Sequence, residues 1–126
     1  MEETEHAIAK IKELNRMKPI LVEGEKDVHA LRLLGLNGEI LTVNDGNSLV
    51  DLCDGIAERY ADIILLTDWD KRGGRLANAI EKNLAGRTRC LTEFRALFAH
   101  STMVKDVEGL PSFIHNMHER FRRPQY

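Results

Sequence analysis

The sequence predicts an α/β fold, in which helices cover both faces of a mostly parallel sheet of about four strands. Short apolar runs alternate along the chain with longer segments of helical periodicity. These runs carry few polar residues, which is typical of strands buried on both faces. The 126 residues are 43% hydrophobic and 30% charged, which is enough apolar material for one domain with its own core. We therefore expect a single three-layer α/β/α domain over residues 1–126.

The first half of the chain contains two predicted strands and their helices. Apolar residues recur at helical spacing over residues 3–16, and Pro19 ends that helix because the residue before a proline avoids the α region. An apolar run then predicts the first strand over residues 20–23. Helical periodicity returns over residues 25–35, which end in a glycine suited to a helix C-terminus. The second strand is predicted over residues 39–43.

The second half follows the same alternation. A turn at residues 44–47 precedes a helix that Ser48 or Asn47 can cap. This helix is expected to bury Leu49, Leu52, Cys53, Ile56 and Tyr60. A long apolar run predicts the third strand over residues 62–67. The remaining elements, in chain order, are a helix over 71–85, a strand over 88–91, and helices over 92–100 and 110–122. The last two helices form a C-terminal extension over about 93–122, beyond a core of about 18–92.

Composition indicates a cytoplasmic globular protein without a membrane partner. No apolar run approaches the roughly 20 residues needed to cross a bilayer. The first six residues lack the apolar segment of a secretory signal. Cys53 and Cys90 are the only thiols, and we expect both to be free and buried. The sequence does not predict an oligomeric state.

Charge is unevenly distributed along the chain. Residues 1–70 contain 15 acidic and 7 basic residues, whereas residues 71–126 contain 5 acidic and 11 basic residues. The sign of the local charge therefore changes directly after Asp70. An acidic site beside a basic half suits a ligand that carries phosphate.

Acidic residues follow two of the predicted strands. Glu23-Gly24 follows the first strand, and Asp68-Trp69-Asp70 follows the third. In a parallel sheet both motifs lie at the carboxyl edge, where ligands of open α/β folds bind. Carboxylates gathered there need a partner, and hard divalent cations prefer oxygen ligands. We therefore expect Glu23, Asp68 and Asp70 to bind Mg²⁺, or Mn²⁺ in its place.

Simpler roles for the same acids remain open. Asp70 is also suited to cap the helix that follows it, with Asp68 as a turn residue. Glu25 and Asp27 are suited to the first turn of their helix, where the helix dipole favours acids. Trp69 is expected to pack on its neighbours rather than to stack on a base.

Glycines and basic residues open the helix after the aspartates. A helix N-terminus presents free amides to anions, and glycine allows a phosphate to approach closely. The alternative is a loose helix start with a solvated basic face. The residues expected to bind substrate are Gly24, Lys71, Arg72, Gly73 and Arg75. Arg89 is a further candidate for positioning a phosphate backbone.

Together these motifs resemble the Toprim domain, which is shared by bacterial-type primases, topoisomerases and several nucleases. The family pattern is an apolar strand ending in Glu-Gly and, after two further strand–helix steps, an apolar strand ending in Asp-x-Asp with a glycine close behind. Glu23-Gly24, the acidic motif at residues 68–70 and Gly73 match this pattern within residues 18–92. The chain is similar to the small stand-alone Toprim proteins of prokaryotes.

The resemblance implies Mg²⁺-dependent phosphoryl transfer on RNA or DNA, with nuclease-like phosphodiester cleavage favoured over nucleotidyl transfer. By that resemblance Glu23 is the general acid or base, and Asp68 and Asp70 hold Mg²⁺. The topoisomerase version carries further acids after Asp-x-Asp, where this chain has Arg72 and Gly74. This departure argues against a second tightly held metal.

Two other functions are weighed against the enzyme. One is a metal-loaded module that binds nucleic acid or a partner protein without turnover, as the small size and the missing acids suggest. The other is a receiver-like regulatory domain, which also has an acidic pocket at its strand ends. Glu23 at the first strand and the lack of a clear lysine on a later strand argue against the receiver.

Overall fold

A computed structural model describes residues 2–122. Its sheet has four parallel strands in the order β2-β1-β3-β4. The strands are β1 (Ile20–Val22), β2 (Ile40–Thr42), β3 (Asp62–Leu65) and β4 (Arg89–Leu91). β1 and β3 are the two central strands and pair with each other. The predicted α/β class and parallel sheet are confirmed.

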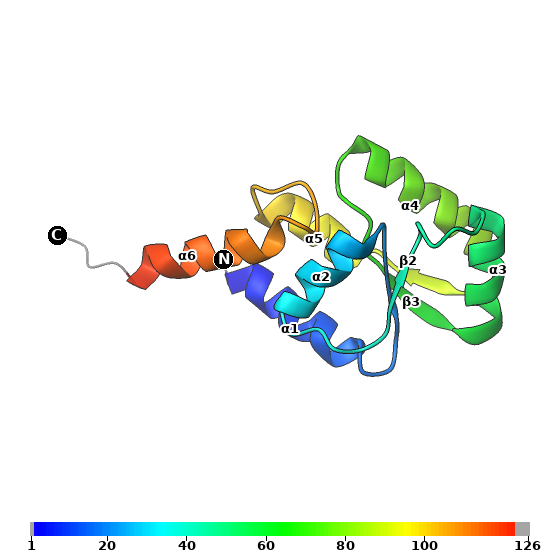
Figure 1. The fold of residues 1–126 in the computed structure, drawn as a ribbon, viewed down its shortest axis with the longest axis horizontal. Helices are drawn as coiled ribbons and strands as arrows, with labels where there is room; N and C mark the ends of the chain where they lie inside the picture. Colours follow the sequence, from blue (N-terminus) through cyan, green and yellow to red (C-terminus); the bar gives the residue numbers. More distant parts are fainter. Residues whose placement is uncertain (1, 123–126) are drawn as a thin grey trace.

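Helices cover both faces of this sheet. They are α1 (Glu2–Leu14), α2 (Glu25–Leu33), α3 (Leu49–Arg59), α4 (Lys71–Leu84), α5 (Glu93–Ser101) and α6 (Leu110–Arg122). Figure 1 shows α3 and α4 on one side of the strands and α1, α2 and α5 on the other. α6 contacts α2 and extends away from the sheet. The arrangement is therefore three-layered, as predicted.

The central strands are buried on both faces, as their unbroken apolar runs predict. Ile20, Val22 and Ile64 belong to the core formed with α1, α2 and α5. Leu21 and Leu65 belong to the core formed with α3 and α4. All five side chains are fully buried. The alternation is the period of two that an extended strand imposes on its side chains.

The observed helices and strands end within a few residues of the predicted bounds, and the third strand is shorter than predicted. β3 ends at Leu65 rather than at residue 67. The amide of Leu66 still donates to the carbonyl of Leu21, at 2.9 Å. β1 ends at Val22, so beyond this point regular strand pairing stops. The chain after β3 is therefore shaped by side-chain contacts.

The two thiols agree with the prediction in being free, but only Cys53 is buried as expected. Within residues 2–122 no helix has the length and apolar character that crossing a membrane requires. Cys53 is buried, Cys90 is half-buried, and both are free thiols. Burial raises the pKa of both, that of Cys90 to about 11. Both thiols are therefore protonated at neutral pH and poor nucleophiles.

The connections between strands diverge at the middle of the sheet. β1 leads through α2 to β2 on one side, whereas β3 leads through α4 to β4 on the other. Ligands of open α/β sheets bind where the connections from adjacent strands diverge in this way. The residues that follow β1 and β3 therefore occupy the favoured position for a site.

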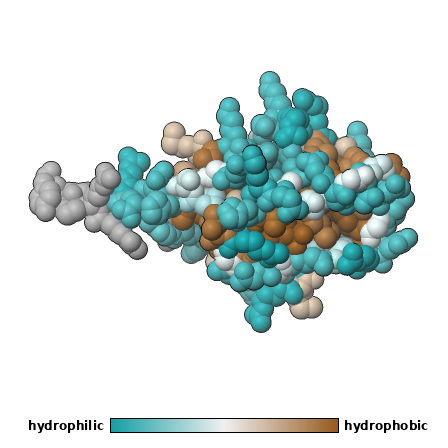
Figure 2. All heavy atoms as spheres, in the orientation of Figure 1, coloured by the Kyte–Doolittle hydropathy of each residue, from teal (hydrophilic) through white to brown (hydrophobic). Residues whose placement is uncertain are grey.

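One edge of the sheet remains at the surface. β2 is an outer strand, and its three residues are half-buried. In Figure 2 an apolar band crosses the middle of the visible face, where β2 lies in Figure 1, between hydrophilic surfaces. The two central strands, by contrast, are covered on both faces and flanked on both sides.

Candidate functional site

Glu23 and Asp68 meet at the carboxyl edge of the two central strands. Glu23 follows β1 directly, and only 7% of its surface is exposed. Its own carbonyl accepts from the amide of Asn44, at 3.0 Å, and continues the pairing with β2. Its carboxylate oxygen Oε2 accepts from the amide of Asp68, at 2.9 Å. The side chain of Glu23 thus continues the contact between β1 and the β3 segment where strand pairing ends.

Arg72 places a positive charge across these two acids. Its Nη2 donates to Glu23 Oε1 at 2.6 Å and lies 3.7 Å from Asp68 Oδ2. The hydrogen bond from Glu23 and its negative charge raise the pKa of Arg72. The guanidinium side chain is 61% exposed, whereas the two carboxylates are 9% and 15% exposed. The cation therefore stands at the mouth of the site and the acids lie inside it.

Asp68 lies in an environment that disfavours its charge. Its Oδ1 accepts from the amide of Val107, at 3.2 Å. Burial raises the pKa of Asp68 to about 6, and the nearby charges of Glu23, Asp27 and Asp106 add to the rise, while the Val107 hydrogen bond opposes it. Oδ2 has only Arg72 at 3.7 Å, which is too long for a hydrogen bond. A cation or a proton bound to this oxygen would therefore stabilise the site more than one bound to any of the other carboxylate oxygens.

Asp27 is the helix-start acid that the sequence predicts. Its Oδ2 accepts from the amide of Gly24 at 3.1 Å, which satisfies the first turn of α2. It is buried, and burial and then the negative charge of Glu23 raise its pKa against the lowering effect of the Gly24 hydrogen bond. The pKa of Asp68 also responds to Asp27. Asp27 therefore belongs to the electrostatic surroundings of the site.

The structure places Asp70 differently from the predicted cluster of three acids. Its Oδ1 accepts from the amide of Gly73 at 2.7 Å, so Asp70 caps α4. Within residues 2–122 no three His, Cys, Asp or Glu side chains are arranged to hold a metal ion. The expectation that three carboxylates converge is corrected to two. The reason is local, because the free amides of a helix's first turn compete for a nearby carboxylate.

The two glycines predicted to approach a phosphate differ in their constraints. A Cβ on Gly73 would lie 1.8 Å from the carbonyl oxygen of Asp68, so only glycine fits there. Gly24 has an extended backbone (φ −157°), and the atom nearest to an added Cβ is Asn44 Nδ2 at 3.6 Å. Glycine is therefore required by packing at Gly73. At Gly24 neither the backbone conformation nor the packing requires glycine.

Arg95 is a site residue that the sequence analysis missed. From α5, its guanidinium donates to the carbonyl of Asp68 at 3.0 and 2.8 Å and to that of Asp70 at 3.3 Å. These hydrogen bonds fix the backbone between β3 and α4. The contacts join positions 25 and 27 residues apart, and no motif in the sequence indicates them.

The segment between α5 and α6 covers one side of the site. Trp69 donates its indole Nε1–H to the carbonyl of Val104 at 2.6 Å and its amide to the carbonyl of Lys105 at 3.0 Å. Its ring lies 5.5 Å from that of Phe98. The expectation that Trp69 packs is confirmed. With the bond from Val107 to Asp68, these contacts fix the C-terminal extension against the acidic motif.

The basic residues predicted to bind substrate do not all lie together. Lys71, Arg72 and Arg75 are exposed on the first turns of α4, beside the acids. Arg89 begins β4 and pairs with Asp62, which begins β3, at 3.2 Å. Because the strands are parallel, these two residues lie at the opposite edge of the sheet. The predicted contribution of Arg89 to the site is therefore wrong.

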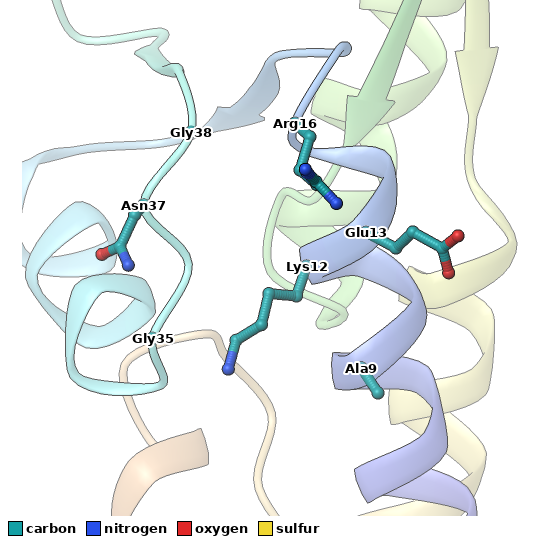
Figure 3. Close-up of a pocket in the computed structure, with 7 residues that line it drawn as sticks. All are labelled: Ala9, Lys12, Glu13, Arg16, Gly35, Asn37 and Gly38. Atoms are coloured by element: carbon teal, nitrogen blue, oxygen red, sulfur yellow. The ribbon is translucent and has the colours of Figure 1, made fainter.

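A cleft of about 650 Å³ also lies away from the acids. It is lined by Ala9, Lys12, Glu13, Arg16, Gly35, Asn37 and Gly38. Figure 3 shows Lys12 reaching across it toward the end of α2, and Glu13 pointing away. Lys12 and Arg16 lie at the C-terminal end of α1, where cations offset the helix dipole. The charge of this cleft is thus accounted for by the two helix ends that border it.

Comparison with known proteins places the chain in a family. No protein-family model matches the sequence. A UPF0292 protein of Pyrococcus furiosus is 32% identical over 126 residues, which cover 98% of this chain and 93% of that protein. A UPF0292 protein of Thermoplasma volcanium is 39% identical over 72 residues, which cover 57% of this chain and 60% of that protein.

A solved structure of a protein from Aquifex aeolicus has the same fold. The two superpose with a TM-score of 0.72 over 82% of this chain and 94% of that one, at 23% sequence identity. At this identity the similarity extends to the fold alone. The match to the Pyrococcus protein, over nearly the whole length of both chains, shows that the chain belongs to the UPF0292 family.

Proposed function

We propose that this chain is a Mg²⁺-dependent phosphoryl-transfer enzyme of Toprim type that cleaves phosphodiester bonds in RNA or DNA. The observation that supports this most directly is the meeting of Glu23 and Asp68 at the switch point of the sheet, where they share the cation of Arg72. Glu23 is buried, and Asp68 is half-buried with a raised pKa, beside a basic helix start. Acids with a raised pKa concentrate at functional sites.

The residues at this position fit a magnesium ion. Mg²⁺ is bound through one or two carboxylates and keeps several waters that a substrate phosphate can replace. Glu23 and Asp68 supply two such oxygen ligands, and Mn²⁺ would use the same atoms. The guanidinium of Arg72 already occupies a position that attracts positive charge. When bound, the metal would neutralise the charge of a substrate phosphate.

The remaining roles follow from where the side chains lie. Glu23 would take up or deliver the proton only when its Oε1 is held by neither Arg72 nor the metal. Lys71 and Arg75 are exposed near the amino end of α4, where free amides favour a phosphate. Asp70 and Arg95 shape the loop between these groups.

The second candidate is a binding module without turnover. It is favoured by the capping role of Asp70, which leaves only two acids for a metal, and by the hydrogen bond that holds Glu23 Oε1. Such a module would still bind nucleic acid through its basic helix start, and salt would weaken that binding.

The test is a nuclease assay on structured RNA and on DNA with Mg²⁺. We expect Mg²⁺-dependent cleavage by the wild type and loss of cleavage in Glu23→Gln and Asp68→Asn. Asp54→Asn is the control, because Asp54 is an exposed acid on α3 that pairs with Arg87 away from the site. Full activity in both site variants would reject the enzyme. Salt-dependent binding without cleavage of any substrate would establish the binding module instead.

A further inference from the structure

We propose that Arg72 is an intramolecular counter-ion that a metal must displace, and that a phosphate-bearing ligand releases it. Phosphate binding and metal binding at Glu23 and Asp68 would then strengthen each other. The inference deepens the proposed function because it concerns the same site. It can be tested by binding alone, without turnover.

The two acids are fixed, and Arg72 is the group that can move. Glu23 Oε2 is held by the amide of Asp68, and Asp68 Oδ1 by the amide of Val107. Both donors are backbone groups that cannot turn away. Arg72 reaches the acids through a long side chain that is 61% exposed. Because the guanidinium already stands in solvent, it can turn into water, whereas the nearly buried Glu23 keeps the hydrogen bond from the Asp68 amide.

The atoms that Arg72 covers are those that a metal needs. The guanidinium contacts Glu23 Oε1 at 2.6 Å and stands 3.7 Å from Asp68 Oδ2. The other oxygen of each carboxylate already accepts from a backbone amide. A divalent cation that binds both acids therefore competes with Arg72 for the same two oxygens.

A phosphate offers Arg72 a better partner. The guanidinium forms two parallel hydrogen bonds with a phosphate, a geometry that its contact with one oxygen of Glu23 does not use. Arg72 lies on the first turn of α4, between Lys71 and Arg75, where the neighbouring basic side chains favour an anion. When a phosphate draws Arg72 away, both acids become free. By thermodynamic linkage, a bound metal must then favour phosphate binding to the same degree.

The experiment measures Mn²⁺ and Mg²⁺ affinity by calorimetry on the full chain. Wild type is compared with Arg72→Gln, with and without a short phosphorothioate oligonucleotide that resists cleavage. Without the oligonucleotide, we expect Arg72→Gln to bind metal roughly fivefold more tightly, the size of one exposed ion pair. The oligonucleotide should increase metal affinity in the wild type and have little effect in Arg72→Gln.

Arg75→Gln is the matched control for metal affinity. It removes the same charge from the same helix, but Arg75 forms no ion pair with Glu23 or Asp68. We expect its metal affinity to remain within about twofold of the wild type, as screened surface charge predicts. If Arg75→Gln gained as much metal affinity as Arg72→Gln, the effect would be one of general charge and the inference would be overturned. Equal or weaker metal binding by Arg72→Gln would also overturn it, as would the absence of metal binding in both proteins.

The outcomes separate this inference from the proposed function. Coupled metal and oligonucleotide binding without nuclease activity would reject cleavage and support the counter-ion role of Arg72. Nuclease activity with no effect of Arg72→Gln on metal affinity would support the enzyme and reject that role.

Discussion

Asp68→Asn is expected to abolish function and, at the same time, to stabilise the fold. Burial raises the pKa of Asp68 from its ordinary value of 3.8 to about 6. The folded protein therefore binds this proton more tightly than the unfolded chain does. The contribution to stability is fully present at low pH and is lost as the pH rises from 3.8 toward about 6. Above that range, the ionised carboxylate opposes folding.

The magnitude follows from the size of the shift. Each unit of pKa difference corresponds to about 1.4 kcal/mol, and the shift is about two units, so the upper limit is about 3 kcal/mol. The side chain is 15% exposed, so solvent screening is small, and we expect roughly 2 kcal/mol. Asparagine has the same shape, and its side-chain oxygen can still accept from the amide of Val107. The substitution therefore removes the charge and retains the hydrogen bond.

The assay is urea denaturation of the wild type and Asp68→Asn at about pH 4 and about pH 8. We expect the variant to be more stable by roughly 2 kcal/mol at the higher pH and by well under ~1 kcal/mol at the lower pH, where Asp68 is protonated in the folded state and about half protonated in the unfolded chain. Comparison at each pH cancels the titration of groups that both proteins share. A stability difference independent of pH, or a variant less stable than the wild type at high pH, would refute the reasoning.

Three further predictions concern the loop that carries the acids. Asp70→Asn should keep both the helix cap and the metal affinity of the wild type, because its side-chain oxygen can still accept from the amide of Gly73. Asp70→Ala should lose about 1 kcal/mol of stability in urea denaturation, since it removes the cap. Loss of metal binding in Asp70→Asn would instead show that Asp70 is a metal ligand. Gly73→Ala should lower stability by about 3 kcal/mol or more, because its Cβ would lie 1.8 Å from the carbonyl oxygen of Asp68. Gly24→Ala is the control: its Cβ would have its nearest contact at 3.6 Å, so its loss of stability should be well under half as large. Arg95→Ala should lose roughly 2 kcal/mol by urea titration because it leaves two carbonyls without their charged donor, and a change within experimental error would show that the loop is held without it.

Much of the fold follows from local pattern. The two central strands carry unbroken apolar runs because both of their faces are covered, and the helices carry one apolar stripe each. The meeting of Glu23 and Asp68 follows from the rule that parallel strands share a carboxyl edge. The choice between metal ligand and cap at Asp70 was open in the sequence. The amide of Gly73 decided it, because the aspartate and the helix start lie three residues apart.

Other parts of the site could not be predicted because they depend on tertiary packing. Val107 reaches Asp68 across 39 residues, and Arg95 reaches it across 27. Neither residue lies in a recognisable motif. The direction of the Arg72 side chain is a further case, since an exposed arginine on a first helical turn can face solvent, phosphate or a carboxylate equally well. Only the buried charge of Glu23 and Asp68 makes the third option favourable here.

The four carboxylate oxygens of Glu23 and Asp68 are not equally satisfied, and this inequality connects stability to function. Three of them accept a hydrogen bond, from the amides of Asp68 and Val107 and from Arg72. Asp68 Oδ2 has the Arg72 guanidinium only at 3.7 Å. Asp68 Oδ2 is not fully buried, so water can solvate it and a divalent cation can reach it from the solvent. The free position at Oδ2 therefore favours a ligand that completes the site, which is the role assigned to the divalent cation.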